Sequence, residues 1–116
     1  MIEQAVRDLA SVYGQGVLIA RDGSRTLARI NEVDMPPGCR PARTAMLLML
    51  DPAAEKPAPY VLPGQLLANG RAPRSTSTQI VGGESWMQFS FNIPWAEAAG
   101  IIRFVAAARQ RFAQND

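Results

Sequence analysis

Prolines and glycines divide this chain into short segments, and that division constrains its fold more than any other sequence feature. Residues 35–41 contain three prolines and a glycine, which remove backbone donors and fix torsions, so neither a helix nor a central strand can cross them. Prolines 57, 59 and 63 permit only a brief extended piece around residues 60–62, at the edge of a sheet. The 116 residues, 47% of them hydrophobic, suffice for one core, so we expect a single domain over residues 1–116.

The first segment has the apolar spacing of a helix. Ile2, Val6, Leu9 and Tyr13 recur every three or four residues, which places them on one stripe. We predict that this helix ends at Gly14. A helix this short is unstable alone, so it should pack against a sheet.

A hairpin and a central strand are predicted next. Residues 17–20 form an apolar run, and Asp22 and Gly23 suit a two-residue turn into a second strand within residues 25–33. Residues 45–50 are apolar on both faces and stop at Asp51, which predicts a strand buried on both sides at the centre of the sheet.

The second half of the chain combines a long loop, a strand and a closing helix. Glycine, proline and small polar residues dominate residues 69–78, which indicates a loop of the length that often carries function. Met87, Phe89 and Phe91 then alternate with polar residues, a pattern typical of a strand with one buried face, entered through a turn at residues 82–83.

Pro94 suits the first turn of the closing helix, with Asn92 or a neighbour as its cap. Its predicted core stripe is Ile101, Val105, Ala108 and Phe112. The predicted fold class is therefore α+β: an N-terminal helix, an antiparallel strand meander, a long loop and a C-terminal helix.

Charge and hydropathy exclude several kinds of partner. The formal charge is only +2, and cations are not clustered with aromatic residues, so nucleic acid is not expected. Residues 1–8 alternate in charge, unlike a secretory signal or a transit peptide. No apolar stretch approaches the roughly 20 residues that span a bilayer, so we expect no membrane partner and a bacterial, cytoplasmic protein.

The residue types needed for most catalytic and metal chemistry are missing. Histidine is absent, which removes imidazole acid–base catalysis and histidine metal sites. One cysteine cannot supply a zinc site, and neither Gly64 nor Gly70 begins a phosphate-binding loop. We therefore predict no metal and no cofactor. Glu32 and Asp34 are interpreted as solvated acids at a strand end rather than a catalytic pair.

Cys39 is the only candidate nucleophile, and a weak one. Arg40 beside it would favour the thiolate, and an exposed loop would admit a substrate. However, no imidazole can activate the thiol, and a lone cysteine in a small protein is usually incidental or buried.

Two tryptophans stand near the end of the chain, where aromatic residues usually join the core. The alternative is an anchor for a partner protein, because tryptophan is enriched at interface hot spots. In the predicted strand, Trp86 points to the polar face, and Met87 and Phe89 point to the other face. Trp86 is therefore a better candidate than Trp95 for a surface or second-layer contact.

The order of elements resembles the ubiquitin-conjugating enzyme (UBC) and RWD superfamily, in particular its small bacterial members. The resemblance is carried by residues 60–64 (YVLPG), 68–70 (ANG), 83–90 (GESWMQFS) and Trp95, and it covers most of the chain as an order of elements. Catalytic members of the superfamily carry a thioester cysteine in the loop after the meander, commonly beyond an asparagine that stabilises the oxyanion. Asn69 stands near that place, but no cysteine follows it, and Cys39 precedes the central strand.

The resemblance therefore implies a non-catalytic interaction module in a bacterial ubiquitin-like conjugation system. Its partner would be an activating enzyme, a conjugating enzyme or the modifier itself. The predicted partner-binding residues are Tyr60, Asn69, Arg71, Arg74 and Trp86.

Two alternatives stay open at the level of sequence. One is an active thioester carrier that uses Cys39, or a position now occupied by Ser75, Ser77 or Ser85. The other is a small-ligand or self-association domain with a pocket between the sheet and the long loop, which would include a homo-oligomer.

Overall fold

The computed structural model describes residues 2–89 and 93–114 and has the predicted α+β class. These residues contain two α-helices and six strands, in the following order along the chain: α1 (Ile2–Tyr13), β1 (Val17–Asp22), β2 (Arg25–Asp34), β3 (Arg43–Leu50), β4 (Ala58–Val61), β5 (Ser77–Val81), β6 (Glu84–Gln88) and α2 (Ile101–Gln110). Short 3₁₀ turns occupy Gly14–Gly16, Glu97–Ala99 and Arg111–Ala113.

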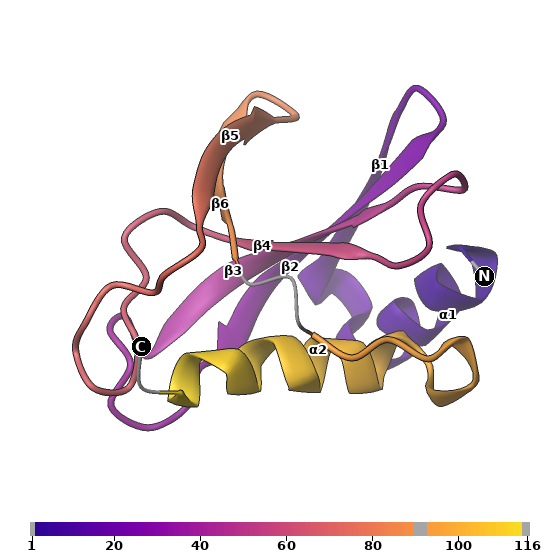
Figure 1. The fold of residues 1–116 in the computed structure, drawn as a ribbon. Helices are drawn as coiled ribbons and strands as arrows, with labels where there is room; N and C mark the ends of the chain where they lie inside the picture. Colours follow the sequence, from indigo (N-terminus) through magenta and orange to yellow (C-terminus); the bar gives the residue numbers. More distant parts are fainter. Residues whose placement is uncertain (1, 90–92, 115–116) are drawn as a thin grey trace.

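The strands form one antiparallel sheet in the order β1-β2-β3-β4-β6-β5. The first four strands are the predicted meander, and β6 returns beside β4 so that β5 becomes the far edge. Both helices lie on the same side of the sheet, while the β1–β2 and β5–β6 hairpins rise from the other side (Figure 1). The sheet therefore has one face covered by helices and one face without them.

The covered face carries the main core, and both predicted helix stripes point into it. Leu9 of α1 is fully buried, with Ile2, Val6 and Tyr13 packed beside it. The predicted stripe of the closing helix is buried at all four positions: Ile101, Val105 and Ala108 lie on α2, whereas Phe112 lies in the 3₁₀ turn that follows it. Phe112 packs edge-to-face on Phe89, with ring centroids 4.8 Å apart, so the end of the chain closes this layer.

Strand β3 confirms the prediction of a central strand buried on both faces. Met46, Leu48 and Leu50 belong to the core beneath the helices, whereas Ala45 and Leu47 belong to a second cluster on the opposite face. Two apolar layers share this strand because successive side chains point to opposite faces.

Two sequence predictions need correction at this point. The first hairpin turns at Gly23 and Ser24, because Asp22 pairs with Arg25 and so belongs to the strand. Helix α2 begins at Ile101 rather than near Pro94, because Gly100 has a φ of 87°, which ends the preceding 3₁₀ turn and starts the helix without a side-chain cap. The proposed cap Asn92, like Phe91, lies outside the described residues.

The prediction that β4 is an edge strand was wrong. β4 lies between β3 and β6, and among the described residues β6 pairs with Tyr60 and Val61 alone. Pro59 pairs with Leu48 of β3 and has no ladder partner on its other side within residues 2–89 and 93–114, so the proline lies where this part of the strand is locally an edge.

Candidate functional site

The sheet face opposite the helices, here called the open face, carries a second apolar cluster. Its buried members are Leu27, Ala45, Leu47, Tyr60, Val81 and Trp86, with Met49, Ala58 and Leu62 partly buried beside them. The buried members on β2, β3, β4 and β6 each lie next to a residue of the helix-covered core, as strand alternation requires. A sheet face without helices is therefore lined with aliphatic and aromatic side chains.

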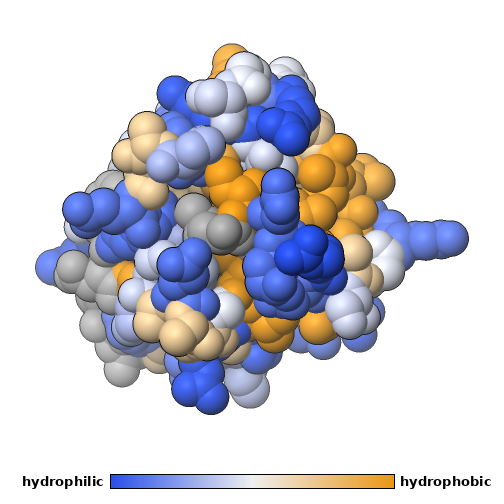
Figure 2. All heavy atoms as spheres, turned by 90° about the vertical axis from the view of Figure 1, so that its right-hand side faces the viewer, coloured by the Kyte–Doolittle hydropathy of each residue, from blue (hydrophilic) through white to orange (hydrophobic). Residues whose placement is uncertain are grey.

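The two hairpins that rise from the open face enclose a hollow of about 200 Å³. It is lined by Leu18, Ala20, Leu27, Arg29, Leu47, Val81, Gly82, Glu84 and Trp86. Leu18 of β1 is 56% exposed, which makes it the accessible apolar wall of the hollow. Viewed from the side that carries the β1–β2 hairpin and the start of α1, strongly hydrophobic side chains are visible between charged ones (Figure 2).

Arg29 of β2 interacts with two other residues that line the hollow, Glu84 and Trp86. Its Nε and Nη2 donate to Oε1 and Oε2 of Glu84 at 3.1 and 3.2 Å, and its guanidinium carbon lies 5.5 Å from the Trp86 ring centroid. This bidentate pair is partly exposed, so its contribution to stability is small, but it fixes the orientation of the charged groups beside the indole. The site thus combines an apolar hollow with an oriented cation and anion at its side.

The predicted partner residues fall into two groups in different parts of the molecule. Trp86 and Tyr60 belong to the open-face cluster, on the face that strand alternation indicated for Trp86. Trp86 is only 1% exposed and Tyr60 only 3%, so neither is the exposed anchor that the surface interpretation required. Burial raises the pKa of the Tyr60 phenol above its ordinary value, with Arg25 opposing the shift in part.

The loop between β4 and β5 holds the other group: Asn69, Arg71 and Arg74, all exposed. The Asn69 side chain accepts a hydrogen bond from the Arg71 backbone N–H at 3.0 Å, and the Gly70 N–H donates to the Leu67 carbonyl. Asn69 therefore stabilises a turn of its own loop.

Cys39 lies in a buried site and not in the exposed loop that a role as nucleophile would require. The residue is 5% exposed, and its Sγ donates to the Phe112 carbonyl at 3.6 Å. Burial raises the pKa of the thiol, which is the opposite of the activation that a nucleophile requires. The loop is closed because the 3₁₀ turn after α2 and the β4–β5 loop pack over it, a long-range effect that the local sequence does not reveal.

Glu32 and Asp34 are exposed at the end of β2, as predicted for solvated acids. Asp34 accepts a hydrogen bond from Arg43 Nε at 2.8 Å. Among residues 2–89 and 93–114, no group of three acidic or cysteine side chains could hold a metal ion.

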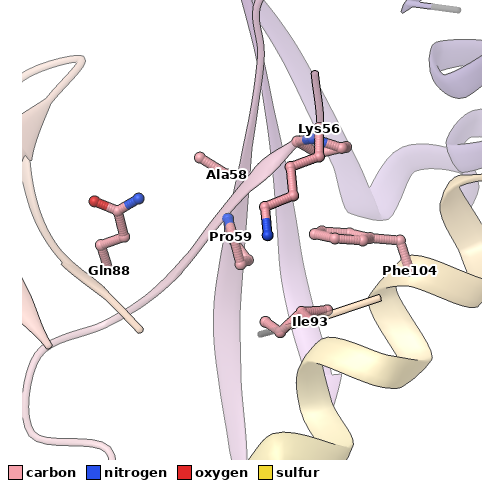
Figure 3. A pocket seen from close by; sticks show the side chains of 7 residues that line it. Lys56, Ala58, Pro59, Gln88, Ile93 and Phe104 are labelled. Carbon is pink, nitrogen blue, oxygen red and sulfur yellow. The ribbon is translucent and has the colours of Figure 1, made fainter. Parts of the chain in front are cut away.

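A smaller hollow of about 120 Å³ lies where β4 and β6 meet α2 (Figure 3). The side chain of Lys56 extends over Pro59 toward Phe104 and Ile93, so the only lysine of the chain occupies its mouth (Figure 3). This space is too small for the ligands that typical pockets of at least about 300 Å³ accommodate.

Sequence reasoning missed most residues that line the open-face hollow, in particular Leu18, Leu27, Arg29 and Glu84. A signal for part of them existed, because Leu18 and Ala20 alternate with Val17 and Ile19 in a run that is apolar on both faces. The contribution of Glu84 depends on the pairing of distant strands.

These features define an α+β protein whose antiparallel sheet is covered by helices on one face and carries an apolar hollow on the other. No protein-family model, curated protein or solved structure matches the chain. No helix within the described residues is long and apolar enough to cross a bilayer.

Proposed function

We propose that this chain is a non-catalytic protein-interaction module of the UBC/RWD-like type that acts as an accessory partner in a bacterial ubiquitin-like conjugation system. It would bind an activating enzyme, a conjugating enzyme or the modifier through its open face. The observation that carries this proposal is the apolar character of a sheet face that no helix covers.

A solvated face of an antiparallel sheet ordinarily carries polar residues. Here the corresponding positions of β2, β3 and β6 hold Leu27, Leu47 and Trp86. These three side chains are themselves buried, at 7%, 3% and 1% exposure, so the accessible apolar surface beside them is that of Leu18, at 56%. Covering this surface with a partner would remove further apolar area from water, which favours association.

The size and chemistry of the hollow favour a protein over a free small molecule. Its volume of about 200 Å³ is below the roughly 300–1,000 Å³ of pockets that enclose drug-sized ligands, but it can receive a large aliphatic or aromatic side chain. Arg29 is of a residue type that is enriched among the residues dominating interface energetics, and the Glu84 pair holds it in place before any partner arrives.

The buried thiol supports a non-catalytic role against the thioester alternative. A thioester carrier must present its sulfur to the modifier's terminus, whereas Cys39 is buried against the 3₁₀ turn that follows α2. Its raised pKa also reduces the fraction of thiolate at neutral pH.

Binding measurements with matched variants test the proposal. The chain would be titrated calorimetrically against the purified activating enzyme, conjugating enzyme and modifier of a bacterial conjugation system. We expect Leu18→Asp to weaken binding at least about tenfold, because it places a charge on the apolar wall. Val12→Asp is the control, since Val12 on α1 is 57% exposed, almost the same as Leu18 at 56%.

Two outcomes would contradict this function. One is the absence of binding to all three proteins. The other is a reductant-sensitive adduct with the modifier after incubation with activating enzyme and ATP, which would identify a thioester carrier. Equal weakening by Leu18→Asp and Val12→Asp would instead exclude the open face as the binding surface.

A further inference from the structure

Strand β5 forms one edge of the sheet and is largely exposed. Four of its five residues are exposed, and Ile80 at 77% is the most exposed large hydrophobic residue in the part of the chain that the structure describes. The β5–β6 hairpin stands away from the helices, so its outer edge faces solvent (Figure 1).

This edge lacks the features that normally prevent edge-to-edge pairing. Charged residues, prolines and β-bulges are the usual protections. β5 contains none of these: its sequence is STQIV, and its register with β6 runs without a shift from Ser77 to Val81. The opposite edge strand, β1, ends in Arg21 and Asp22.

The turn after β5 determines which backbone groups point outward. Gly82 and Gly83 have φ values of 61° and 82°, as a type I′ turn requires, so Val81 and Glu84 form the hydrogen-bonded pair that closes the hairpin. Hydrogen-bonded and non-bonded pairs alternate along an antiparallel ladder. The N–H and C=O groups of Thr78 and Ile80 therefore point away from β6, toward the open edge.

We propose that β5 pairs with β5 of a second copy of this chain, antiparallel about a two-fold axis at Gln79. In this register Thr78 lies opposite Ile80 of the second copy, and each such pair exchanges two backbone hydrogen bonds. Gln79 faces its own counterpart across the axis as a non-bonded pair. The register uses every outward-pointing backbone group of Thr78 and Ile80 in both copies.

Side-chain chemistry favours a second copy as the occupant of this edge. Thr78 and Ile80 point to the same side of the sheet, so each exposed Ile80 packs against a β-branched Thr78 across the interface. The strand carries no charge, so two copies meet without repulsion even though the chain has a net charge of +2. The two sheets become one continuous sheet.

The interface is small, because it consists of one short strand from each copy. Stable interfaces bury about 1,200–2,000 Å² in total, and a five-residue edge offers less than this. The association is therefore weak and concentration-dependent.

Cysteine cross-linking tests the register. Non-bonded antiparallel pairs place their Cα atoms about 4.5 Å apart, within the range that a disulfide spans. With oxidised glutathione as oxidant, Gln79→Cys should form a covalent dimer at least about tenfold faster than the matched control Ser77→Cys, whose counterpart in the second copy lies far along the strand. The unmodified chain, with only the buried Cys39, should not cross-link. Equal rates for the two variants, or a faster reaction of Ser77→Cys, would overturn the register.

Sedimentation over a range of concentrations tests the dimer itself. The apparent mass should rise from 12.6 kDa toward twice that value, and Ile80→Lys should keep the chain monomeric. Ile19→Lys, the same substitution at a 42% exposed position on the opposite edge strand, should leave dimerisation unchanged. A chain that is monomeric at every concentration overturns the proposal, even if β5 then captures a strand of another protein. Loss of the dimer in Ile19→Lys alone would overturn it in favour of β1.

Discussion

The Cys39 thiol shows how the environment of a single side chain decides its chemistry. A neighbouring arginine alone would favour the thiolate. In the folded chain, Cys39 lies within the core beside Met35 and Phe112, and its Sγ is directed to a backbone carbonyl. Desolvation disfavours the charged form, so the pKa of the thiol is raised and the residue acts as a small core side chain.

Thiol reactivity should report this burial directly. We expect Cys39 in the folded chain to react with a disulfide reagent at least about tenfold more slowly than in the urea-unfolded chain at pH 8, because access requires local opening. Since the folded pKa is raised, the thiolate forms at higher pH than in the unfolded chain, and the rate should keep rising above pH 8.5, near the ordinary value. Stopped-flow absorbance measures both. Equal rates in the folded and unfolded chains would show that the thiol is accessible.

At the scale of elements, the two long loops are held together by backbone contacts. The Leu66 N–H donates to the Arg40 carbonyl, and the Ala68 N–H donates to the Phe112 carbonyl. Gly38 lies at the closest point, where a Cβ would sit 2.5 Å from the Ala68 carbonyl oxygen. The loops before β3 and after β4 thus form one structural unit with the 3₁₀ turn that follows α2.

A pair of glycine substitutions separates backbone strain from this close approach. Gly38 and Gly64 both have a φ of 92°, but a Cβ at Gly64 would meet nothing within 4 Å. Each alanine substitution should cost about 1–3 kcal/mol for the unfavourable φ. Gly38→Ala should cost roughly 1–3 kcal/mol more, because the loops must also move apart. Urea unfolding measures the difference, and equal losses would indicate that the contact is easily relieved.

The elements that sequence patterns predict are those with at least one clearly buried face. Helix α1 and the stripe of the closing helix were predicted because their apolar periods reflect burial against a single layer, and β3 was predicted because its continuous apolar run reflects burial on both faces. Strand β5 was not predicted: four of its residues are exposed, so no alternation marks it, and residues 77–78 were placed in the preceding loop. The start of α2 was misplaced because Pro94 suits a helix start, whereas Gly100 determines it.

The candidate site was predictable only in part, for a related reason. Strand alternation correctly indicated the face of Trp86. The burial of the Trp86 ring was not predictable from the local sequence. The ring is covered by the curled β5–β6 hairpin and by Arg29, which lies 55 residues before Glu84 in the chain. Such contacts depend on the strand order β4-β6-β5, which no local pattern contains.

At the scale of the whole molecule, the sheet separates two apolar layers of different completeness. One is closed by both helices, and the other is open where the hairpins diverge (Figure 1). Leu47 and Leu48 are neighbours on β3, at 3% and 0% exposure, and point into different layers. Truncating each leucine to alanine therefore compares how the two layers tolerate the same loss of side-chain volume.

Leu48→Ala should destabilise the chain more than Leu47→Ala. The cost of a leucine-to-alanine change is about 2–5 kcal/mol and depends on how well the site can collapse or rehydrate. Leu48 is enclosed by the helix layer, so we expect a loss near the upper end of that range; Leu47 lines the open-face hollow, where water can enter the new space, so we expect a loss near the lower end. Urea unfolding of the monomer compares the two. A loss for Leu47→Ala that equals or exceeds that for Leu48→Ala would mean that the open face is closed in solution, which contradicts its role as an accessible binding surface.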